Sequence, residues 1–347
     1  MTPPASTSDA MTLPTSPALS SRISGFISTG LAGARTEPGS LPKPELQSLT
    51  LADGGTIRLT WWWAEMPMLG TPTVLVFPGL NNSSRWHFVQ HAVASLHKRG
   101  YHAAVVDYRG IDQSLTSPRT FGADSSADFP EIVAAVSARI PPGSDLFAVG
   151  HSMGGACLAK YLGDAAGPSC RVRAAATLSS PLALASHMRR LESSPSWRAA
   201  NFLTASIARL TLLRKWLTDP PSRPHLRAVD WAGVFACMSL RDLERATICP
   251  MNGYADPEDY YAHSQPDLQR LGVPLLVIHA RDDPVIGVSE LPWAELRAHP
   301  KIQVVLTPTG GHLGYYASDE AAQRVDALVG DFFEKHRSRA VPGRSRL

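Results

Sequence analysis

The stretch AVGHSMGGACLA, residues 148–159, contains the pattern G-x-S-x-G at Gly150, Ser152 and Gly154. A strand-like apolar run precedes the pattern and a helical pattern follows it, which predicts a sharp turn from strand to helix. Such a turn forces its central residue into strained backbone angles, and flanking glycines avoid side-chain clashes. The turn would present the Ser152 hydroxyl at a helix N-terminus, where free amides favour a developing negative charge. The alternative is a turn of small residues that only lets the helix pack closely on the strand.

Apolar runs of strand length alternate with helical patterns on both sides of this turn. Such runs lie at residues 71–79, 101–110, 145–150 and 273–280. Repeated strand-helix units need a parallel sheet that is covered on both faces. Residues 47–63 instead alternate apolar and polar positions around an Asp-Gly-Gly turn, which is typical of a β-hairpin. The sequence therefore predicts an α/β fold with a mostly parallel sheet and helices on both faces.

The alternation stops at residue 182, and no strand-length apolar run follows until after residue 266. An insertion of this length between two strands of one sheet is best interpreted as a helical cap, and caps lie over sites. We expect one domain over residues 46–336, with its cap at about 182–266. Residues 1–45 are rich in Pro, Ser, Thr and Gly and are expected to form a disordered tail, with a targeting segment as the open alternative. Residues 337–347 are expected to form a C-terminal tail.

Composition and charge exclude several classes of protein. Of the 347 residues, 44% are hydrophobic and 18% are charged, which is ordinary for a soluble globular chain. The net charge is only +3, so nucleic acid is not an expected partner. No segment reaches the roughly 18 uninterrupted apolar residues of a membrane span, and no secretory signal is recognisable. We expect a cytoplasmic protein with at most a transient contact with a membrane surface.

The cysteines and most histidines give no indication of a metal site. The cysteines are few and lack metal-ligand or disulfide spacing, so they are interpreted as buried thiols in a reducing compartment: Cys157, Cys170, Cys237 and Cys249. His87 and His91 have i, i+4 spacing on a predicted helix, but no third ligand lies nearby in the sequence. We therefore expect neither a metal nor a cofactor.

A serine hydroxyl is a weak nucleophile, so the Ser152 hypothesis requires a histidine base and an acid that orients it. In a sheet of this type both partners follow the carboxyl ends of later strands, in the order Ser, Asp, His. His312 follows an apolar run near the end of the chain and is the expected base, with an ordinary turn histidine as the alternative. His151 would point away from its neighbour Ser152, and His279 lies within a predicted strand.

Two acidic residues, Asp282 and Asp283, follow the apolar run PLLVIHA at the edge of the sheet where the acid is needed. Adjacent side chains on an extended segment point in opposite directions, so only one of them can face His312. The other would cap the turn before Pro284. Spacing from the strand end favours Asp283, but the residue pattern alone leaves the choice open.

An oxyanion hole needs two amide donors beside the nucleophile. The amide of Met153 is the first candidate because it directly follows Ser152. The amide of Leu80 is the second, since Gly79 lets the backbone turn inward beneath a substrate. The alternative for this loop is an ordinary glycine turn at the end of a strand.

These residues bring the chain close to a known group of proteins. The sequence resembles the α/β-hydrolase fold and, within it, the YheT-like branch that includes bacterial esterases and the ABHD1/ABHD3-type lipid hydrolases. The resemblance runs from about residue 45 to residue 333 and is carried by LTLADGGTIRLTWW, HSMGGACLAKYLGD, GYADPEDYYAHSQP, PLLVIHARDDPVI and TGGHLGYY. It implies Ser152 as nucleophile, Asp283 as acid and His312 as base. Pro78 stands where the branch usually has a histidine, and Ala156 where an asparagine is common.

Residues and resemblance together predict a serine carboxylic-ester hydrolase. It would act on short- to medium-chain acyl esters or acyl lipids through an acyl-enzyme. Two alternatives stay open: an alcohol O-acyltransferase that uses the same acyl-enzyme, and a non-catalytic ligand-binding protein of the same fold. A stripe of apolar side chains in the cap either lines an acyl channel or simply packs: Phe202, Leu203, Ile207, Leu210 and Leu213.

Overall fold

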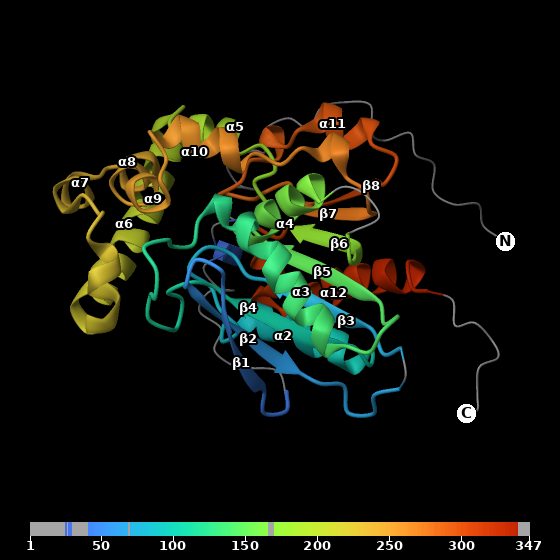
Figure 1. Ribbon diagram of the computed structural model, residues 1–347. Coiled ribbons are helices and arrows are strands. Elements are labelled where there is room, and N and C mark those ends of the chain that lie inside the picture. Colours follow the sequence, from blue (N-terminus) through green and yellow to red (C-terminus); the bar gives the residue numbers. More distant parts are fainter. Residues whose placement is uncertain (1–24, 26, 30–40, 69, 166–169, 339–347) are drawn as a thin grey trace.

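The computed structural model describes residues 25, 27–29, 41–68, 70–165 and 170–338. Within these residues the strands form one sheet in the order β1-β2-β4-β3-β5-β6-β7-β8 (Figure 1). The first hairpin is antiparallel, β2 is antiparallel to β4, and all later pairs are parallel. The predicted hairpin and the predicted mostly parallel sheet are therefore confirmed. The strands are β1 (Glu45–Thr50), β2 (Thr56–Trp62), β3 (Thr73–Phe77), β4 (His102–Asp107), β5 (Leu146–His151), β6 (Val172–Leu178), β7 (Leu275–Ala280) and β8 (Ile302–Thr307).

The continuous apolar runs of the parallel strands are explained by helices on both faces of the sheet. In β3, Leu75 and Phe77 belong to the core on one face, whereas Val74 and Val76 belong to the core on the other. The first core is covered by α3 (Phe129–Arg139), α4 (Met153–Asp164) and α11 (Trp293–Ala298), and the second by α2 (His87–Lys98) and α12 (Asp319–Lys335). Short 3-10 helices complete the layers: η2 (Ala123–Asp128), η4 (Leu268–Arg270), η5 (Val288–Glu290) and η6 (Gly314–Ala317).

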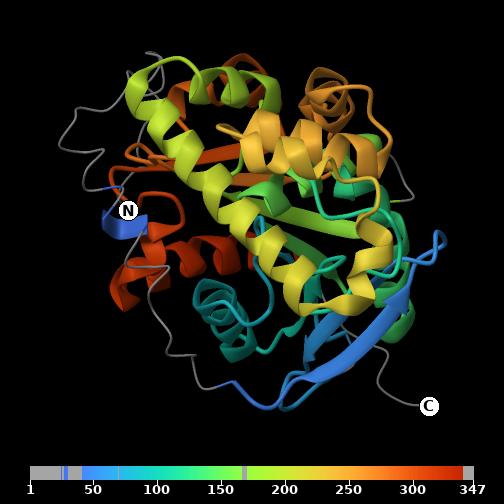
Figure 2. The same cartoon turned by 90° about the vertical axis from the view of Figure 1, so that its left-hand side faces the viewer.

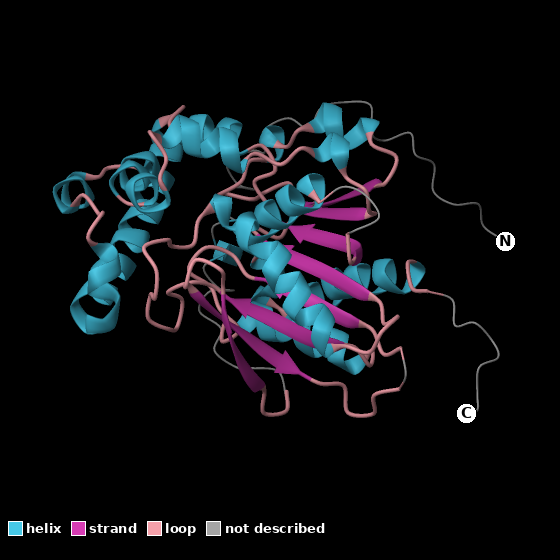
Figure 3. Ribbon diagram, in the orientation of Figure 1, coloured by secondary structure: helices cyan, strands magenta, loops and turns pink. Residues whose placement is uncertain are grey.

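The chain between β6 and β7 is helical and forms a cap. In Figures 1 and 3 most of its helices lie beyond the carboxyl ends of the parallel strands. The cap has a small apolar core of its own, which includes Leu226, Val234 and Leu243. Its elements are α5 (Leu184–Leu191), α6 (Pro195–Thr218), η3 (Pro220–Leu226), α7 (Trp231–Ala236), α8 (Leu240–Ala246), α9 (Ile248–Asn252) and α10 (Pro257–Ser264).

The segment expected as an N-terminal tail is only partly described. Residues 1–24, 26 and 30–40 lie outside the described residues, as do residues 339–347 of the expected C-terminal tail. Gly25 and residues 27–29 are helical and pack against the loop that follows β8. This contact was not predicted from the sequence. Among the helices that the structure describes, none combines the length and apolar character needed to cross a bilayer.

Candidate active site

The turn between β5 and α4 has the strained geometry expected of the G-x-S-x-G pattern. Ser152 has φ 50° and ψ −123°, a region that residues other than glycine rarely adopt. A Cβ atom on Gly150 would lie 2.4 Å from the Cα of Gly155, and one on Gly154 would lie 2.2 Å from the carbonyl oxygen of Pro78. Only glycine fits at these two positions. The close packing around the turn therefore holds Ser152 in its strained conformation.

Three side chains from three separate loops meet at this turn. The Oγ of Ser152 lies 2.9 Å from Nε2 of His312, and Nδ1 of His312 lies 3.0 Å from Oδ2 of Asp283. Asp283 is fully buried, and the His312 side chain is 14% exposed. In the tautomer whose Nδ1–H donates a hydrogen bond to Asp283, Nε2 is free to accept a hydrogen bond from the Ser152 hydroxyl. The structure thus brings together the residues expected as nucleophile, base and acid.

The structure distinguishes between the two adjacent aspartates. Besides the bond from His312, the Asp283 carboxylate accepts hydrogen bonds from the backbone N–H groups of Val285 and Ile286. Each nitrogen lies 2.8 Å from Oδ1. Burial by itself would raise the pKa of Asp283, but the neighbouring His312 and these hydrogen bonds outweigh burial and lower the pKa. Asp283 is therefore ionised at neutral pH and able to orient the imidazole.

Asp282 points elsewhere. Its Oδ1 accepts the backbone N–H of Gly311 at 2.9 Å, and burial raises its pKa. This bond ties the end of β7 to the loop that carries His312. Asp282 therefore holds the loop and does not contact the imidazole. The expectation that this aspartate caps the turn before Pro284 is wrong, because the turn amides of Val285 and Ile286 donate to Asp283 itself.

The amides expected as an oxyanion hole are available. Met153 is the first residue of α4, and Leu80 follows Gly79 in the loop after β3. No hydrogen bond from either backbone N–H is found among the described residues. A Cβ atom on Gly79 would lie 3.2 Å from the Cβ of Ser152, so glycine allows this loop to pass close to the nucleophile.

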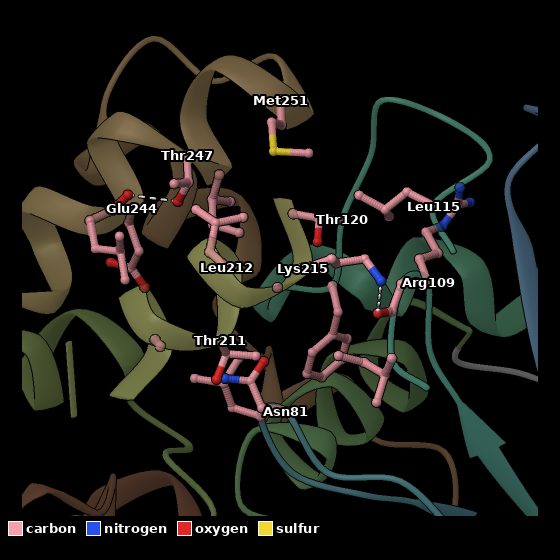
Figure 4. Close-up of a pocket in the computed structure, with 18 of the residues that line it drawn as sticks. Asn81, Arg109, Leu115, Thr120, Thr211, Leu212, Lys215, Glu244, Thr247 and Met251 are labelled. Atoms are coloured by element: carbon pink, nitrogen blue, oxygen red, sulfur yellow. Dashed lines mark hydrogen bonds between the residues drawn. The ribbon is translucent and has the colours of Figure 1, made fainter. Parts of the chain in front are cut away.

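A largely apolar cavity of about 140 Å³ lies between the sheet and the cap (Figure 4). Leu80 and Met153 contribute to its wall. The face of α6 that lines it carries Ala208, Thr211, Leu212 and Lys215. The hypothesis that the stripe from Phe202 to Leu213 lines an acyl channel is wrong. None of these side chains borders the cavity, and Phe202, Leu203, Ile207 and Leu210 are exposed on another face of α6.

The other histidines that the structure describes near the site do not contact Ser152 or Asp283 through a hydrogen bond, and two of them, His279 and His91, have other partners. The Nε2 atom of His279 lies 2.9 Å from the carbonyl oxygen of Ile286, and burial lowers the pKa of His279. His91 contacts Asp326 at 2.8 Å. His151 is fully buried, and burial lowers its pKa to about 3. Within the described part of the chain, His, Cys, Asp and Glu side chains do not gather into a metal-binding group.

A residue from the expected tail supports the His312 loop. The Oγ1 of Thr29 accepts the backbone N–H of His312 at 2.8 Å and donates to the carbonyl oxygen of Gly25 at 2.8 Å. The contact is tight, because a Cβ atom on Gly311 would lie 2.4 Å from that Gly25 oxygen. Nothing in the Pro-, Ser- and Thr-rich segment around Thr29 indicated this role, since a single hydrogen bond leaves no periodic pattern.

The sheet order, the strained serine turn and the cap define the α/β-hydrolase class of proteins. Residues 71–313 match the family described as "Serine aminopeptidase, S33", and this match covers more than half of the chain. The chain therefore belongs to this family of α/β-hydrolases.

Named relatives agree with this assignment. The chain is 28% identical over 313 residues to the embryogenesis-associated protein EMB8 of Picea glauca, covering 84% of this chain and 66% of that protein. It is 29% identical over 272 residues to phospholipase ABHD3 of Bos taurus, covering 76% of this chain and 64% of that protein. The chain thus spans slightly less than two thirds of the length of these relatives. The resemblance to the ABHD-type branch is confirmed, and the relative's name agrees with the expected enzyme class.

A solved structure shows the same fold. The esterase Pf2001 of Pyrococcus furiosus superimposes with a TM-score of 0.55 at 15% sequence identity, covering 88% of this chain and 99% of that chain. At this low identity the similarity concerns the fold alone. The predicted α/β-hydrolase fold is therefore confirmed independently of the sequence relatives.

The Thr29 contact can be tested through the reactivity of Ser152. Thr29→Val removes the oxygen that accepts the His312 amide, so the loop loses a hydrogen bond worth about 1 kcal/mol. We expect a fluorophosphonate probe to label Ser152 several-fold more slowly, measured as a time course by intact mass. Thr29→Ser keeps the oxygen and is the matched control. Equal labelling rates for Thr29→Val and Thr29→Ser would contradict the supporting role.

Proposed function

We propose that this chain is a carboxylic ester hydrolase with Ser152 as nucleophile, His312 as general base and Asp283 as the orienting acid. One observation carries the proposal: an unbroken series of hydrogen bonds from Asp283 through His312 to a strained serine. Beside that serine, at the wall of an apolar cavity, lie two amides that find no hydrogen-bond acceptor among the described residues. This arrangement fits acyl transfer from an ester, because nucleophile, base and oxyanion donors surround one point.

The reaction follows from the positions of these groups. Nε2 of His312 takes the hydroxyl proton while Oγ of Ser152 bonds to the ester carbonyl carbon, and the carbonyl electron pair moves onto oxygen. The amides of Met153 and Leu80 hold that oxyanion. The C–O bond to the alcohol then breaks, and the alcohol leaves with the proton from His312. Water, deprotonated by the same imidazole, releases the acid and restores Ser152, while Asp283 stabilises the imidazolium throughout.

The cavity supports an acyl substrate of short to medium length. Its wall next to the amides is apolar and includes Leu80, Phe121, Met153 and Ile248. Transfer of an acyl chain from water into this cavity is favourable by about 0.8 kcal/mol of free energy for each buried methylene group. An acyl lipid satisfies this requirement, and the phospholipase among the relatives supports that substrate class.

The outer face of α6 is suited to a transient contact with a lipid surface. Leu203, Ile207 and Leu210 are 58%, 56% and 63% exposed, and in Figure 2 this helix runs across the face turned towards the viewer. The helix also carries Arg198, Arg209 and Arg214 and has no acidic residue. Exposed apolar side chains on a basic helix are typical of binding to the interface of an anionic membrane. Such a contact would place the cap next to its lipid substrates.

The catalytic roles are tested by a matched pair of substitutions. Asp283→Asn leaves the shape intact but no longer fixes the tautomer of His312, so we expect kcat for a p-nitrophenyl ester to fall by about 10⁴-fold. Asp282→Asn affects only the loop contact with Gly311 and is expected to cost far less. Equal losses from the two variants would contradict the assignment of the acid.

The nucleophile is tested by fluorophosphonate labelling of the wild-type protein and of Ser152→Ala. We expect the wild type to gain one adduct and the variant to gain none. Absence of both ester hydrolysis and a Ser152-dependent adduct would contradict the proposal. It would favour a ligand-binding protein of this fold.

The membrane contact is tested by co-sedimentation with phosphatidylglycerol vesicles. Leu203→Ser, Ile207→Ser and Leu210→Ser are combined in one variant, which removes three side chains that would enter the interface. Binding is expected to weaken at least about tenfold, since burying each such side chain contributes about 1.5 kcal/mol or more. Met66→Ser with Met68→Ser removes two even more exposed apolar residues outside the cap and should leave binding intact. Similar binding by both variants and the wild type would contradict the assignment.

A further inference from the structure

A carboxyl group interrupts the apolar face that α8 presents to the cavity. Leu240, Leu243 and Glu244 of α8 line this space, as does Thr247 directly after the helix. The spacing of three and four residues places Leu243 and Glu244 on the same face of α8 as Leu240. An apolar side chain is expected at such a position, because a carboxyl group next to an apolar cavity loses much of its hydration. Glu244 is therefore the exception that requires an explanation.

The two oxygens of Glu244 have different surroundings. Oε2 accepts the hydroxyl of Tyr261, which comes from α10. Oε1 makes no hydrogen bond among the described residues, and it is not enclosed within the protein. The nearby Arg241 is engaged by Glu192 and Glu258. Burial raises the pKa of Glu244 to about 7, with Tyr261 and Arg241 acting in the opposite direction. One oxygen thus ties α8 to α10, and the other is available to a ligand.

The cationic residues of the cavity are already satisfied. Lys215 donates to the carbonyl oxygens of Gly110 and Gln113, both at 2.8 Å, and Arg109 pairs with Asp53 and Asp128. Both cations lie well away from Glu244 on the other side of the pocket in Figure 4. They neither neutralise the Glu244 carboxyl nor compete for a group bound to it.

We propose that Glu244 accepts a hydrogen bond from a hydroxyl group on the acyl chain, so that the cavity selects hydroxyacyl esters. This inference rests on the proposed ester hydrolysis. A hydroxyl bonds to a carboxyl group in either protonation state, whereas an ammonium group needs the ionised form and must itself be desolvated in a largely apolar space. A plain acyl chain would leave Oε1 buried without a partner, which is a penalty that the hydroxyl removes.

The experiment compares kcat/KM for paired p-nitrophenyl esters, from hexanoate to dodecanoate, with and without a terminal hydroxyl. At the chain length that reaches Glu244, the wild type is expected to prefer the hydroxylated ester at least about tenfold, as one hydrogen bond to such a group allows. Glu244→Leu is expected to reverse this preference, because the plain chain then meets an apolar wall. Glu244→Met provides the same test should the leucine variant fold poorly.

Two further arms separate this role from a structural one. Tyr261→Phe removes the bond between α8 and α10 but keeps Oε1, so the preference for the hydroxylated ester should persist. Terminal amino esters test the ammonium alternative: a preference for them that Glu244→Gln abolishes would overturn the assignment to a hydroxyl.

The outcomes distinguish the inference from the proposed function. An equal preference in the wild type and Glu244→Leu would overturn the role of Glu244 while plain esters are still hydrolysed. Failure of the wild type to cleave any ester of the series would overturn both.

Discussion

The strained backbone of Ser152 is the constraint on which the site depends. Its positive φ is held by glycines at positions 150 and 154, which allow β5, α4 and the loop after β3 to approach one another. That approach places the serine hydroxyl within reach of His312, beside two amides that have no acceptor in the part of the chain that the structure describes. The parallel sheet positions the partners of Ser152, because it brings the carboxyl ends of β5, β7 and β8 to one edge. Ser152 and Asp283, which bond to the imidazole of His312, both come from loops at that edge.

Much of this arrangement could be predicted from the sequence, because periodicity reports which residues share an environment. The apolar runs gave the strands, and the glycine pattern gave the serine turn. The residue pattern alone could not choose between Asp282 and Asp283, since acids occupy both directions off the strand end; the family resemblance implied Asp283, which is the one that contacts His312. The contact of Thr29 with the His312 loop could not be predicted, because it joins residues 283 positions apart through one hydrogen bond.

The helical cap shows the same limit of prediction from sequence periodicity. The apolar stripe of α6 was recognised, but periodicity does not say whether a face points to the cavity or to solvent, and here it points outwards. In α8 the segment LRDLERA has the composition of an exposed charged helix. Only the structure places Glu244 beside leucines at the cavity wall. We thus propose separate tasks for the two faces of the cap, contact with a lipid surface outside and selection of the acyl chain inside.

The most direct test of the account is the mass of the protein during turnover. A reaction with an octanoate ester, quenched in acid, should contain protein heavier by one octanoyl group, and peptide mapping should place that group on Ser152. Asp283→Asn should form the same adduct far more slowly. Ester hydrolysis that proceeds at full rate in Ser152→Ala, or an acyl group found on another residue, would contradict the account.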